Sequence, residues 1–131
     1  MIVVDASAMV EWLLQTPIGA VVEARLFRDG DELHSPHLVD VEVTQALRRL
    51  VRSGEMGANR AAEAVEDLGD LDLHRHAHVE LLSRAWQLRE NVTAYDAMYV
   101  ALAEALDATV ITCDAALARA SGHRARIEAI A

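Results

Sequence analysis

The chain contains no lysine, because all 12 of its basic residues are arginine. This absence excludes a phosphate-binding loop of the GxxxxGK[ST] kind and any mechanism that forms a Schiff base on lysine. The one cysteine, Cys113, cannot form a disulfide within the chain, and its apolar, β-branched surroundings indicate a buried thiol rather than a nucleophile. No apolar stretch reaches the roughly 18 to 20 residues that a membrane-spanning helix needs, and no basic leader precedes the first strand. We therefore expect a cytoplasmic protein with no membrane contact.

Positive charge is scarce, with 12 basic residues against 21 acidic ones and a formal net charge of -9. Nucleic-acid phosphates are bound mainly by basic side chains, so this balance argues against a broad nucleic-acid surface but not against a single cleft. At 131 residues, 53% of them hydrophobic, the chain can bury a core, and no linker, repeat or low-complexity stretch divides it. We predict a single domain over residues 1–131.

Short β-branched runs alternate with amphipathic segments along the whole chain. Strands are predicted at residues 1–5, 32–34, 71–74, 109–112 and 126–130, and helices at residues 8–14, 17–28, 36–52, 58–68, 79–90, 95–106 and 115–120. Thr16-Pro17 and Ser35-Pro36 each place a capping hydroxyl before proline, which is typical of a helix N-terminus. The alternation predicts an α/β fold, a doubly wound α/β/α domain with a central parallel sheet of about five strands.

Two acidic residues follow predicted strands of this sheet. Asp5 ends the first strand and Asp114 comes just after the fourth, with the hydroxyls of Ser7 and Thr112 close in sequence. Ligands of such sheets bind outside the carboxyl ends of the strands, where the strand order reverses. If the two strands are neighbours, about 4.8 Å apart, both carboxylates face one small volume.

Two further acids, Glu42 and Asp96, lie within predicted helices among apolar neighbours. A carboxylate in apolar surroundings needs either exposure or a counter-charge, and Mg²⁺ or Mn²⁺ would supply that charge because hard cations prefer carboxylate oxygens. Structural roles remain open for each: Asp96 could complete a capping box, Asp114 could cap a helix, and Glu42 could pair with Arg49. Asp5 has little evident structural use. Spacing alone leaves both interpretations open.

Four segments resemble, in order and spacing, the four motifs of the PIN domain as they occur in VapC-type toxins of bacterial toxin–antitoxin pairs. These segments are Val3-Val4-Asp5-Ala6-Ser7, the run from Asp40 to Arg49, the run from Thr93 to Ala103, and Ile111-Thr112-Cys113-Asp114. The resemblance implies a PIN-like fold and a Mg²⁺- or Mn²⁺-dependent endoribonuclease. It gives metal-binding and catalytic roles to Asp5, Glu42, Asp96 and Asp114, and supporting roles to Ser7 and Thr112.

The same resemblance implies an RNA substrate, a homodimer, and inhibition by a small VapB-type antitoxin that places an arginine in the acidic site. The chain departs from the family pattern at Gln45, where asparagine is frequent, and at Glu11, which precedes Trp12 where lysine is common. Both departures are peripheral to the four acids. They put contacts with the substrate in doubt rather than the catalytic set.

A basic stretch, Arg48, Arg49 and Arg52, lies on the same predicted helix as Glu42. These arginines could guide RNA phosphates toward a metal, or could pair with neighbouring glutamates or with an antitoxin. The aromatic residues, Tyr99 among them, are predicted to lie in the core or at an interface.

His74, His76 and His78 alternate along the chain and could bind a transition metal on an extended strand. A solvated strand end or loop is the simpler interpretation of this run.

Two other functions compete with the nuclease. An aspartyl-phosphate phosphotransfer domain also has a strand-end aspartate on a parallel sheet, but such domains use a lysine beside it, and this chain has none. A non-catalytic PIN-like binding module would not need all four acids, and all four are present.

Overall fold

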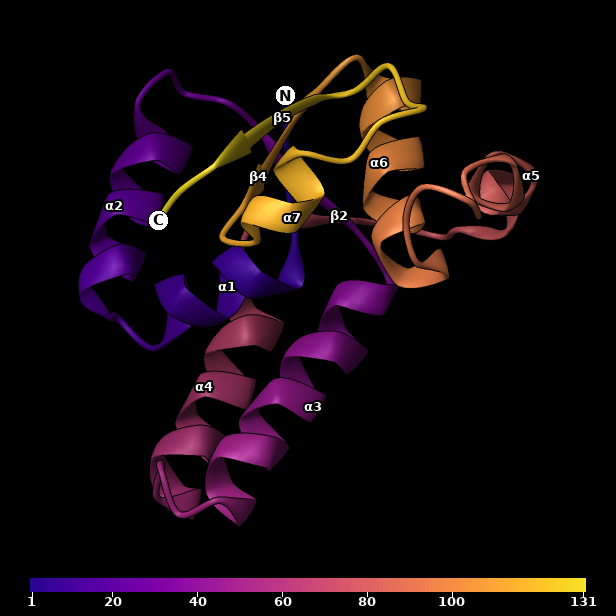
Figure 1. Cartoon of the computed structure of the whole chain (residues 1–131). Helices are drawn as coiled ribbons and strands as arrows, with labels where there is room; N and C mark the ends of the chain where they lie inside the picture. Colours follow the sequence, from indigo (N-terminus) through magenta and orange to yellow (C-terminus); the bar gives the residue numbers. More distant parts are fainter.

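The computed structural model describes residues 1–131 as one parallel sheet of five strands flanked by helices (Figure 1). The strands lie in the order β3-β2-β1-β4-β5, and every neighbouring pair is parallel. They span β1 (Ile2–Val4), β2 (Leu33–Pro36), β3 (His74–His76), β4 (Thr109–Thr112) and β5 (Arg126–Ala129). The predicted doubly wound α/β fold is confirmed, and the strand order reverses between β1 and β4.

The helices are α1 (Ala6–Leu13), α2 (Pro17–Phe27), α3 (Leu38–Arg52), α4 (Ala58–Asp70), α5 (Leu82–Gln87), α6 (Ala94–Leu106) and α7 (Ala115–Ala118), with a 3-10 turn at Val79–Leu81. In Figure 1 the strands run between α2 on one side and α6 on the other. Helices α3 and α4 form a hairpin, which extends away from the sheet. None of these helices has both the length and the apolar character needed to cross a bilayer.

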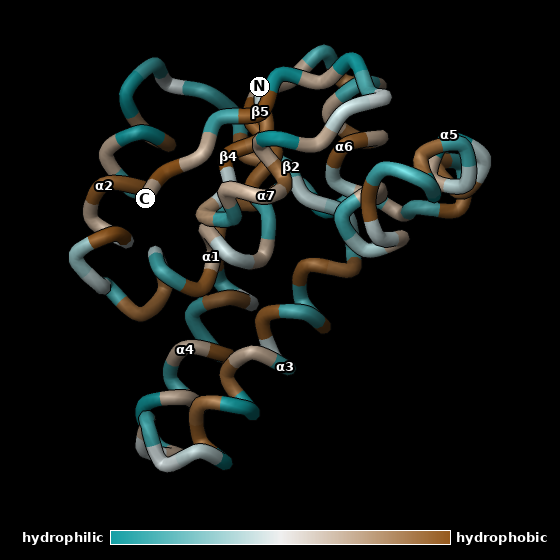
Figure 2. The backbone as a smooth tube through the Cα atoms, viewed as in Figure 1, coloured by the Kyte–Doolittle hydropathy of each residue, from teal (hydrophilic) through white to brown (hydrophobic).

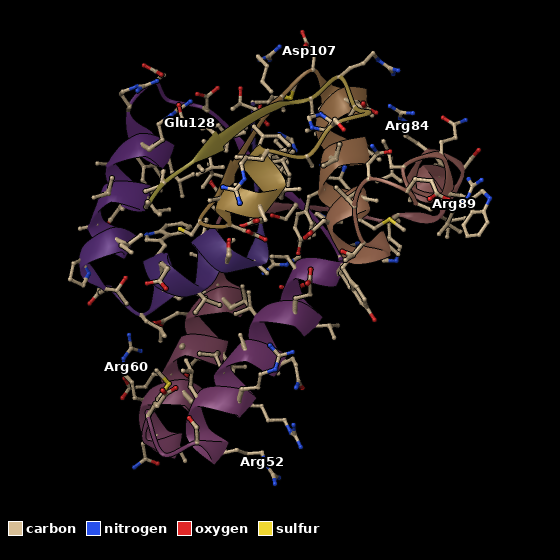
Figure 3. All side chains as sticks on the ribbon, in the orientation of Figure 1. Arg52, Arg60, Arg84, Arg89, Asp107 and Glu128 are labelled. Atoms are coloured by element: carbon tan, nitrogen blue, oxygen red, sulfur yellow. The ribbon has the colours of Figure 1, made fainter.

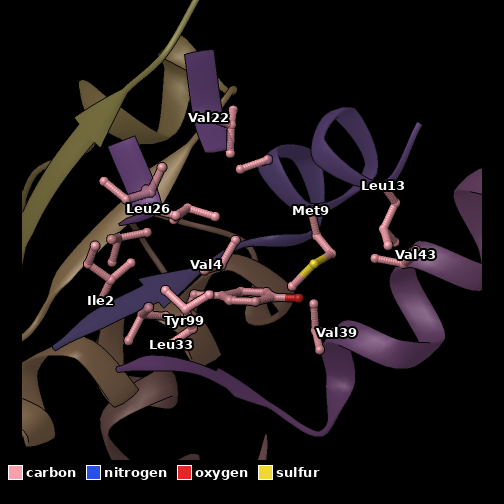
Figure 4. Packing of buried hydrophobic residues seen from close by; sticks show 14 of the residues in the cluster. Ile2, Val4, Met9, Leu13, Val22, Leu26, Leu33, Val39, Val43 and Tyr99 are labelled. Atoms are coloured by element: carbon pink, nitrogen blue, oxygen red, sulfur yellow. The ribbon is translucent and has the colours of Figure 1, made fainter. Parts of the chain in front are cut away.

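The core forms on both faces of β1 and β4, whose side chains are almost fully buried. A central parallel strand is covered by helices on both faces, which explains why its sequence is apolar without alternation. Helix α6 is buried along seven consecutive residues, Ala97 to Ala103. The apolar residues in Figure 2 follow these inner segments, and Figure 4 shows Tyr99 of α6 packed among Val4, Leu33 and Val39. Asp96 therefore lies in the first turn of α6, directly before the part of this helix that is buried in the core.

The prediction that Ser35 and Pro36 start a helix is wrong, because both residues belong to β2. The Ser35 hydroxyl donates to the Val4 carbonyl oxygen at 2.6 Å, so it joins β2 to β1 and does not cap a helix. The ladder between these strands ends at His34, so Pro36 lies beyond it and costs no hydrogen bond to β1. Helix α3 begins at Leu38, without a side-chain cap.

The third strand and the following helix also differ from prediction. Strand β3 covers His74–His76 rather than residues 71–74, since pairing with β2 and not apolar patterning defines this edge strand. The helix expected over residues 79–90 is a 3-10 turn followed by the shorter α5. No side chain caps either of these two segments at its start. Without a cap, the first turn has unpaired backbone N–H groups and tightens to 3-10 geometry.

Gly19 permits a close approach of α2 to α1. A Cβ atom at Gly19 would lie 2.0 Å from the carbonyl oxygen of Glu11 in α1. We therefore expect Gly19→Ala to lower the free energy of unfolding by about 2–4 kcal/mol, measured by urea denaturation, because the two helices must separate. Gly69→Ala in α4, where a Cβ meets nothing within 4 Å, is the matched control and should be neutral or stabilise by up to about 1 kcal/mol. Equal stability of the two variants would contradict this packing.

Candidate metal centre at the carboxyl ends of β1 and β4

Asp5 is the buried centre of the candidate site, with 4% of its surface exposed. It follows β1 and caps α1, since its Oδ1 accepts hydrogen bonds from the Ala8 backbone N–H at 3.0 Å and from the Ser7 hydroxyl at 2.7 Å. Its Oδ2 accepts from the Thr112 hydroxyl of the neighbouring strand β4. The expectation that Asp5 has little structural use is therefore wrong. Three donors fix both of its oxygens in place.

Ser7 and Thr112 form a hydroxyl bridge between α1 and the end of β4. Their oxygens lie 3.2 Å apart, the Cys113 N–H donates to Ser7 Oγ at 2.9 Å, and the Asp114 N–H donates to Thr112 Oγ1 at 2.9 Å. The predicted proximity of Asp5 and Asp114 follows from the confirmed pairing of β1 with β4. The structure thus brings together both supporting hydroxyls and two of the four acids.

Asp114 has the capping role that the sequence left open, and α6 is capped by Thr93. Asp114 caps α7 by accepting the Ala116 N–H at 2.9 Å. The Asp96 N–H donates to the Thr93 hydroxyl at 3.1 Å, so Thr93 caps α6 and Asp96 stands in its first turn. Because capping needs only one oxygen or the backbone, both carboxylates retain oxygens that can bind a ligand.

Glu42 contacts Tyr99 rather than Arg49. The Tyr99 hydroxyl donates to Glu42 Oε1 at 2.6 Å, across the interface between α6 and α3. Figure 4 shows the Tyr99 oxygen pointing toward the end of α3 that carries Val39. Burial and this hydrogen bond raise the pKa of Tyr99 above its usual range, so the phenol remains a donor. Sequence reasoning missed this partner, although Tyr99 lies three residues after Asp96 and so shares its helix face.

Three acids of the site, Asp5, Glu42 and Asp96, have raised pKa values. Burial raises the pKa of Asp96 to about 6, and the negative charges of Asp5, Asp114 and Glu42 add to the shift. Burial is also the main cause of the raised pKa of Asp5 and of Glu42. Burial also raises the pKa of Cys113 to about 11, which keeps it a thiol. Cys113 is only partly buried and lines the larger hollow between α1 and α3, so the prediction of a buried thiol holds in part.

No cationic side chain neutralises these acids. Eight of the twelve arginines form ion pairs, and in every pair the partner is an acid outside this site. A concentration of carboxylate oxygens without a basic partner fits a hard divalent cation such as Mg²⁺ or Mn²⁺. As placed, no three His, Cys, Asp or Glu side chains of the chain surround one ion position. The set fits the ion by chemistry and charge, and side-chain rotation must complete the geometry.

Residues of the candidate site line two hollows in the surface. The larger, about 780 Å³, lies between α1 and α3 and includes Ser7, Glu42 and Arg49 in its lining. The smaller, about 430 Å³, includes Asp96 and Asp114.

The predicted basic stretch spreads along α3. Arg49 lines the larger hollow, whereas Arg52 lies at the far end of the helix (Figure 3), about 15 Å from Glu42 at 1.5 Å per residue. Arg48, Arg49 and Arg52 are exposed, and none of them forms an ion pair. Pairing with a glutamate of the same chain is therefore not their role.

Comparison with known proteins gives consistent matches over the whole chain. The family model of the PIN domain matches residues 2–122. Ribonuclease VapC12 of Mycobacterium tuberculosis is 43% identical over 131 residues, which is 100% of both chains. Among solved structures, VapBC2 from Rickettsia felis, bound to a DNA fragment from their promoter, superposes with a TM-score of 0.72 at 14% identity, over 100% of both chains. Mycobacterium tuberculosis VapC20, a Sarcin-Ricin loop cleaving toxin, gives a TM-score of 0.68 at 16% identity, over 90% of this chain and 93% of that one.

The raised pKa of Asp96 makes its ionisation unfavourable for the fold. The native state holds the proton more tightly than the unfolded chain, so stability falls as the pH rises from about 4 to about 6, and the loss persists above pH 6. In metal-free buffer with chelator, Asp96→Asn should therefore raise Tm at pH 7.5 by a few degrees, corresponding to about 1 kcal/mol after allowance for solvent screening. The difference should vanish near pH 4. The exposed Asp67→Asn in α4 serves as control, and a pH-independent gain in Asp96→Asn would contradict this assignment.

Proposed function

This chain belongs to the PIN-domain family, in its VapC-type branch, and from that premise we propose that it is the endoribonuclease toxin of a toxin–antitoxin pair. One observation carries the proposal: the carboxylates of Asp5, Glu42, Asp96 and Asp114 gather at the reversal point of the sheet, and no basic residue neutralises them. Such a set supports hydrolysis of RNA phosphodiesters with Mg²⁺ or Mn²⁺ as cofactor. The name of its relative Ribonuclease VapC12 agrees with this activity.

The protein's part in the reaction is to hold and orient. When bound, the divalent ion supplies positive charge that stabilises the phosphoryl oxygens and lowers the pKa of a water molecule. Asp5 has both oxygens fixed by neutral donors, so it keeps its orientation before any ligand arrives. Asp96 and Asp114 line the smaller hollow, where their carboxylates can orient the attacking water for in-line displacement.

RNA reaches the acids along the larger hollow in this proposal. Arg49 and Gln45 line it beside Glu42, and a guanidinium there can bind a phosphate with two parallel hydrogen bonds. Arg48 and Arg52 continue the unpaired positive charge along α3. The chain as a whole has a net charge of -9, which is unfavourable for binding RNA. General affinity for RNA is therefore weak, and binding depends on the arginines of α3.

We also propose a VapB-type antitoxin and a second copy of the chain as partners. The uncompensated acids offer a place for an arginine of a small antitoxin, which would neutralise them and block the metal. The VapBC2 structure of Rickettsia felis contains such a pair, which supports the proposal by likeness. Light scattering of the purified protein tests the homodimer, and co-purification with the product of a neighbouring gene tests the antitoxin.

Removal of one site carboxylate should abolish cleavage while the fold persists. Purified protein is incubated with transfer, ribosomal and messenger RNA, with Mn²⁺ or with EDTA, beside Asp5→Asn and Asp96→Asn. We expect a loss of at least about 10²-fold in both variants and in EDTA, because each acid places charge at the reacting phosphate. Asp67→Asn should cleave normally. Full activity in either site variant would refute the assignment, and failure to bind Mg²⁺ or Mn²⁺ would favour a non-catalytic binding module.

Tyr99→Phe tests the orientation of Glu42 separately from its charge. The substitution removes one hydroxyl and keeps the buried ring, so the fold should lose only about 1 kcal/mol. Loss of an orienting hydrogen bond to a metal ligand typically weakens metal binding 10- to 100-fold. Calorimetric titration with Mn²⁺ measures this directly. Unchanged affinity in Tyr99→Phe would show that the hydrogen bond has only a structural role.

A further inference from the structure

Arg75 of strand β3 contacts both ends of the helical hairpin that α3 and α4 form. Its Nε donates to the two carboxylate oxygens of Asp40, at 3.0 and 2.8 Å, in the first turn of α3. Its Nη2 donates to the carbonyl oxygen of Leu68, at 2.6 Å, in the last turn of α4. One guanidinium of an edge strand therefore holds the start of one helix and the end of the other.

Both contacts of Arg75 suit the electrostatics of the helix ends. Aligned peptide dipoles leave partial positive charge at a helix start and partial negative charge at its end, so an anion is stabilised at the first and a cation at the second. Asp40 lies at the start of α3, and the guanidinium lies at the end of α4. The Arg75 and Asp40 side chains are 23% and 40% exposed, so water and salt screen this pair less than a fully exposed one.

Helix α3 lacks the side-chain cap that usually fixes a helix start. The side chain of His37, which precedes the helix, makes no capping hydrogen bond, and the His37 N–H donates to the His76 carbonyl oxygen of β3 at 2.8 Å. Core packing of Val39 seats this turn against the sheet, but apolar contacts have no preferred direction. Charge-assisted hydrogen bonds do have one. Strand β3 therefore provides the directed contacts that a cap would otherwise provide.

We propose that Arg75 is a positioning residue of the carboxylate site, which acts on Glu42 through Asp40 and the first turn of α3. Glu42 follows Asp40 by two residues, and side chains two apart on a helix do not face each other. Arg75 therefore sets the rotation of the helix, and the helix backbone carries the effect to Glu42. From α6, Tyr99 donates directly to Glu42 Oε1 at 2.6 Å. The carboxylate of Glu42 is thus oriented by one direct contact and by one that acts through α3.

The rotation of α3 also places Arg49, which the proposed RNA path uses. Arg49 lies seven residues after Glu42, so the two share a helix face, and both line the larger hollow. Loss of the contact between Arg75 and Asp40 would then displace a metal ligand and a phosphate contact together. The inference rests here on the proposed function, because metal affinity depends on Arg75 only if Glu42 binds the metal.

The first measurement follows the hydrogen bond between Tyr99 and Glu42 and needs no metal. With isotope-labelled tyrosine, the chain gives two Cζ resonances by NMR, from Tyr95 and Tyr99, and Tyr95→Phe assigns them. Glu42→Gln removes the charged acceptor of the Tyr99 hydroxyl and marks the resonance position without it. In buffer with chelator, we expect Arg75→Ala and Asp40→Asn each to move the Tyr99 resonance toward that position.

The second measurement is the affinity for Mn²⁺, by calorimetric titration of the same variants. We expect Arg75→Ala to weaken binding about tenfold, since partners that orient metal ligands typically contribute 10- to 100-fold. Arg75→Lys keeps the charge but has one nitrogen in place of a planar fork, so it should restore only part of the affinity. The double variant Arg75→Ala/Asp40→Ala should bind no more weakly than Arg75→Ala alone, because both changes break the same contact.

Arg84→Ala is the matched control. Arg84 donates to both carboxylate oxygens of Glu104, at 2.7 and 3.0 Å, and its side chain is 24% exposed, close to the value for Arg75. Glu104 lies near the end of α6, eight residues after Asp96, and Figure 3 shows Arg84 far from the hairpin of α3 and α4. Arg84→Ala should lower Tm as Arg75→Ala does, and should leave the Tyr99 resonance and the Mn²⁺ affinity unchanged. Lost stability alone therefore does not produce the expected result.

Three outcomes would overturn the proposal. They are a Tyr99 resonance that stays in place in Arg75→Ala and Asp40→Asn, an equal movement in Arg84→Ala, and undiminished Mn²⁺ affinity in Arg75→Ala when the parent binds the ion. If Arg75→Ala does not fold, Asp40→Asn decides, because it keeps the size of the side chain and removes its charge. A parent that neither binds Mn²⁺ nor cleaves RNA would refute the proposed function, and the Tyr99 resonance would still decide whether Arg75 positions Glu42.

Discussion

The hydrogen bonds to Asp5 are the interaction on which the rest of the site depends. The residue leaves β1, starts α1 and accepts a hydroxyl from Thr112 at the end of β4, so one carboxylate connects the two strands where the sheet order reverses. An aspartate buried without these donors would be neutral or would destabilise the core. The same contacts that fold this end of the molecule keep a carboxylate oriented there, so the structural and functional roles coincide.

Charge is distributed so that this end of the sheet remains uncompensated. Arginines pair with acids around the periphery, for example Arg84 with Glu104 at 2.7 Å and Arg75 with Asp40 at 2.8 Å. None forms an ion pair with the four central acids, and the absence of lysine removes the other candidate partner. Mutual repulsion is then relieved by protons or by a divalent cation. The pKa of Asp96, raised to about 6, expresses this cost in the metal-free protein.

The sequence predicted the central strands of the sheet better than its periphery. Residues 1–5 and 109–112 are apolar because they are buried on both faces, and that signal is local. Strand β3 has no such signal, since His74–His76 is held by pairing with β2. Pro36 was predicted to start a helix but ends β2, because a hydroxyl residue before proline is compatible with a strand end as well as with a helix start. The contact of Tyr99 with Glu42 joins residues far apart in the sequence, so only the packing of α6 on α3 reveals it.

The acidic site lies at the carboxyl ends of the strands for a topological reason. Crossover connections of a parallel sheet place strand ends and helix starts together at one edge, where backbone N–H groups stabilise carboxylates such as Asp5 and Asp114. Those N–H groups are neutral donors, so they hold the carboxylates in place without cancelling their charge. The acidic end of the sheet therefore keeps its attraction for a hard divalent cation, because carboxylate oxygens are the ligands that such ions prefer.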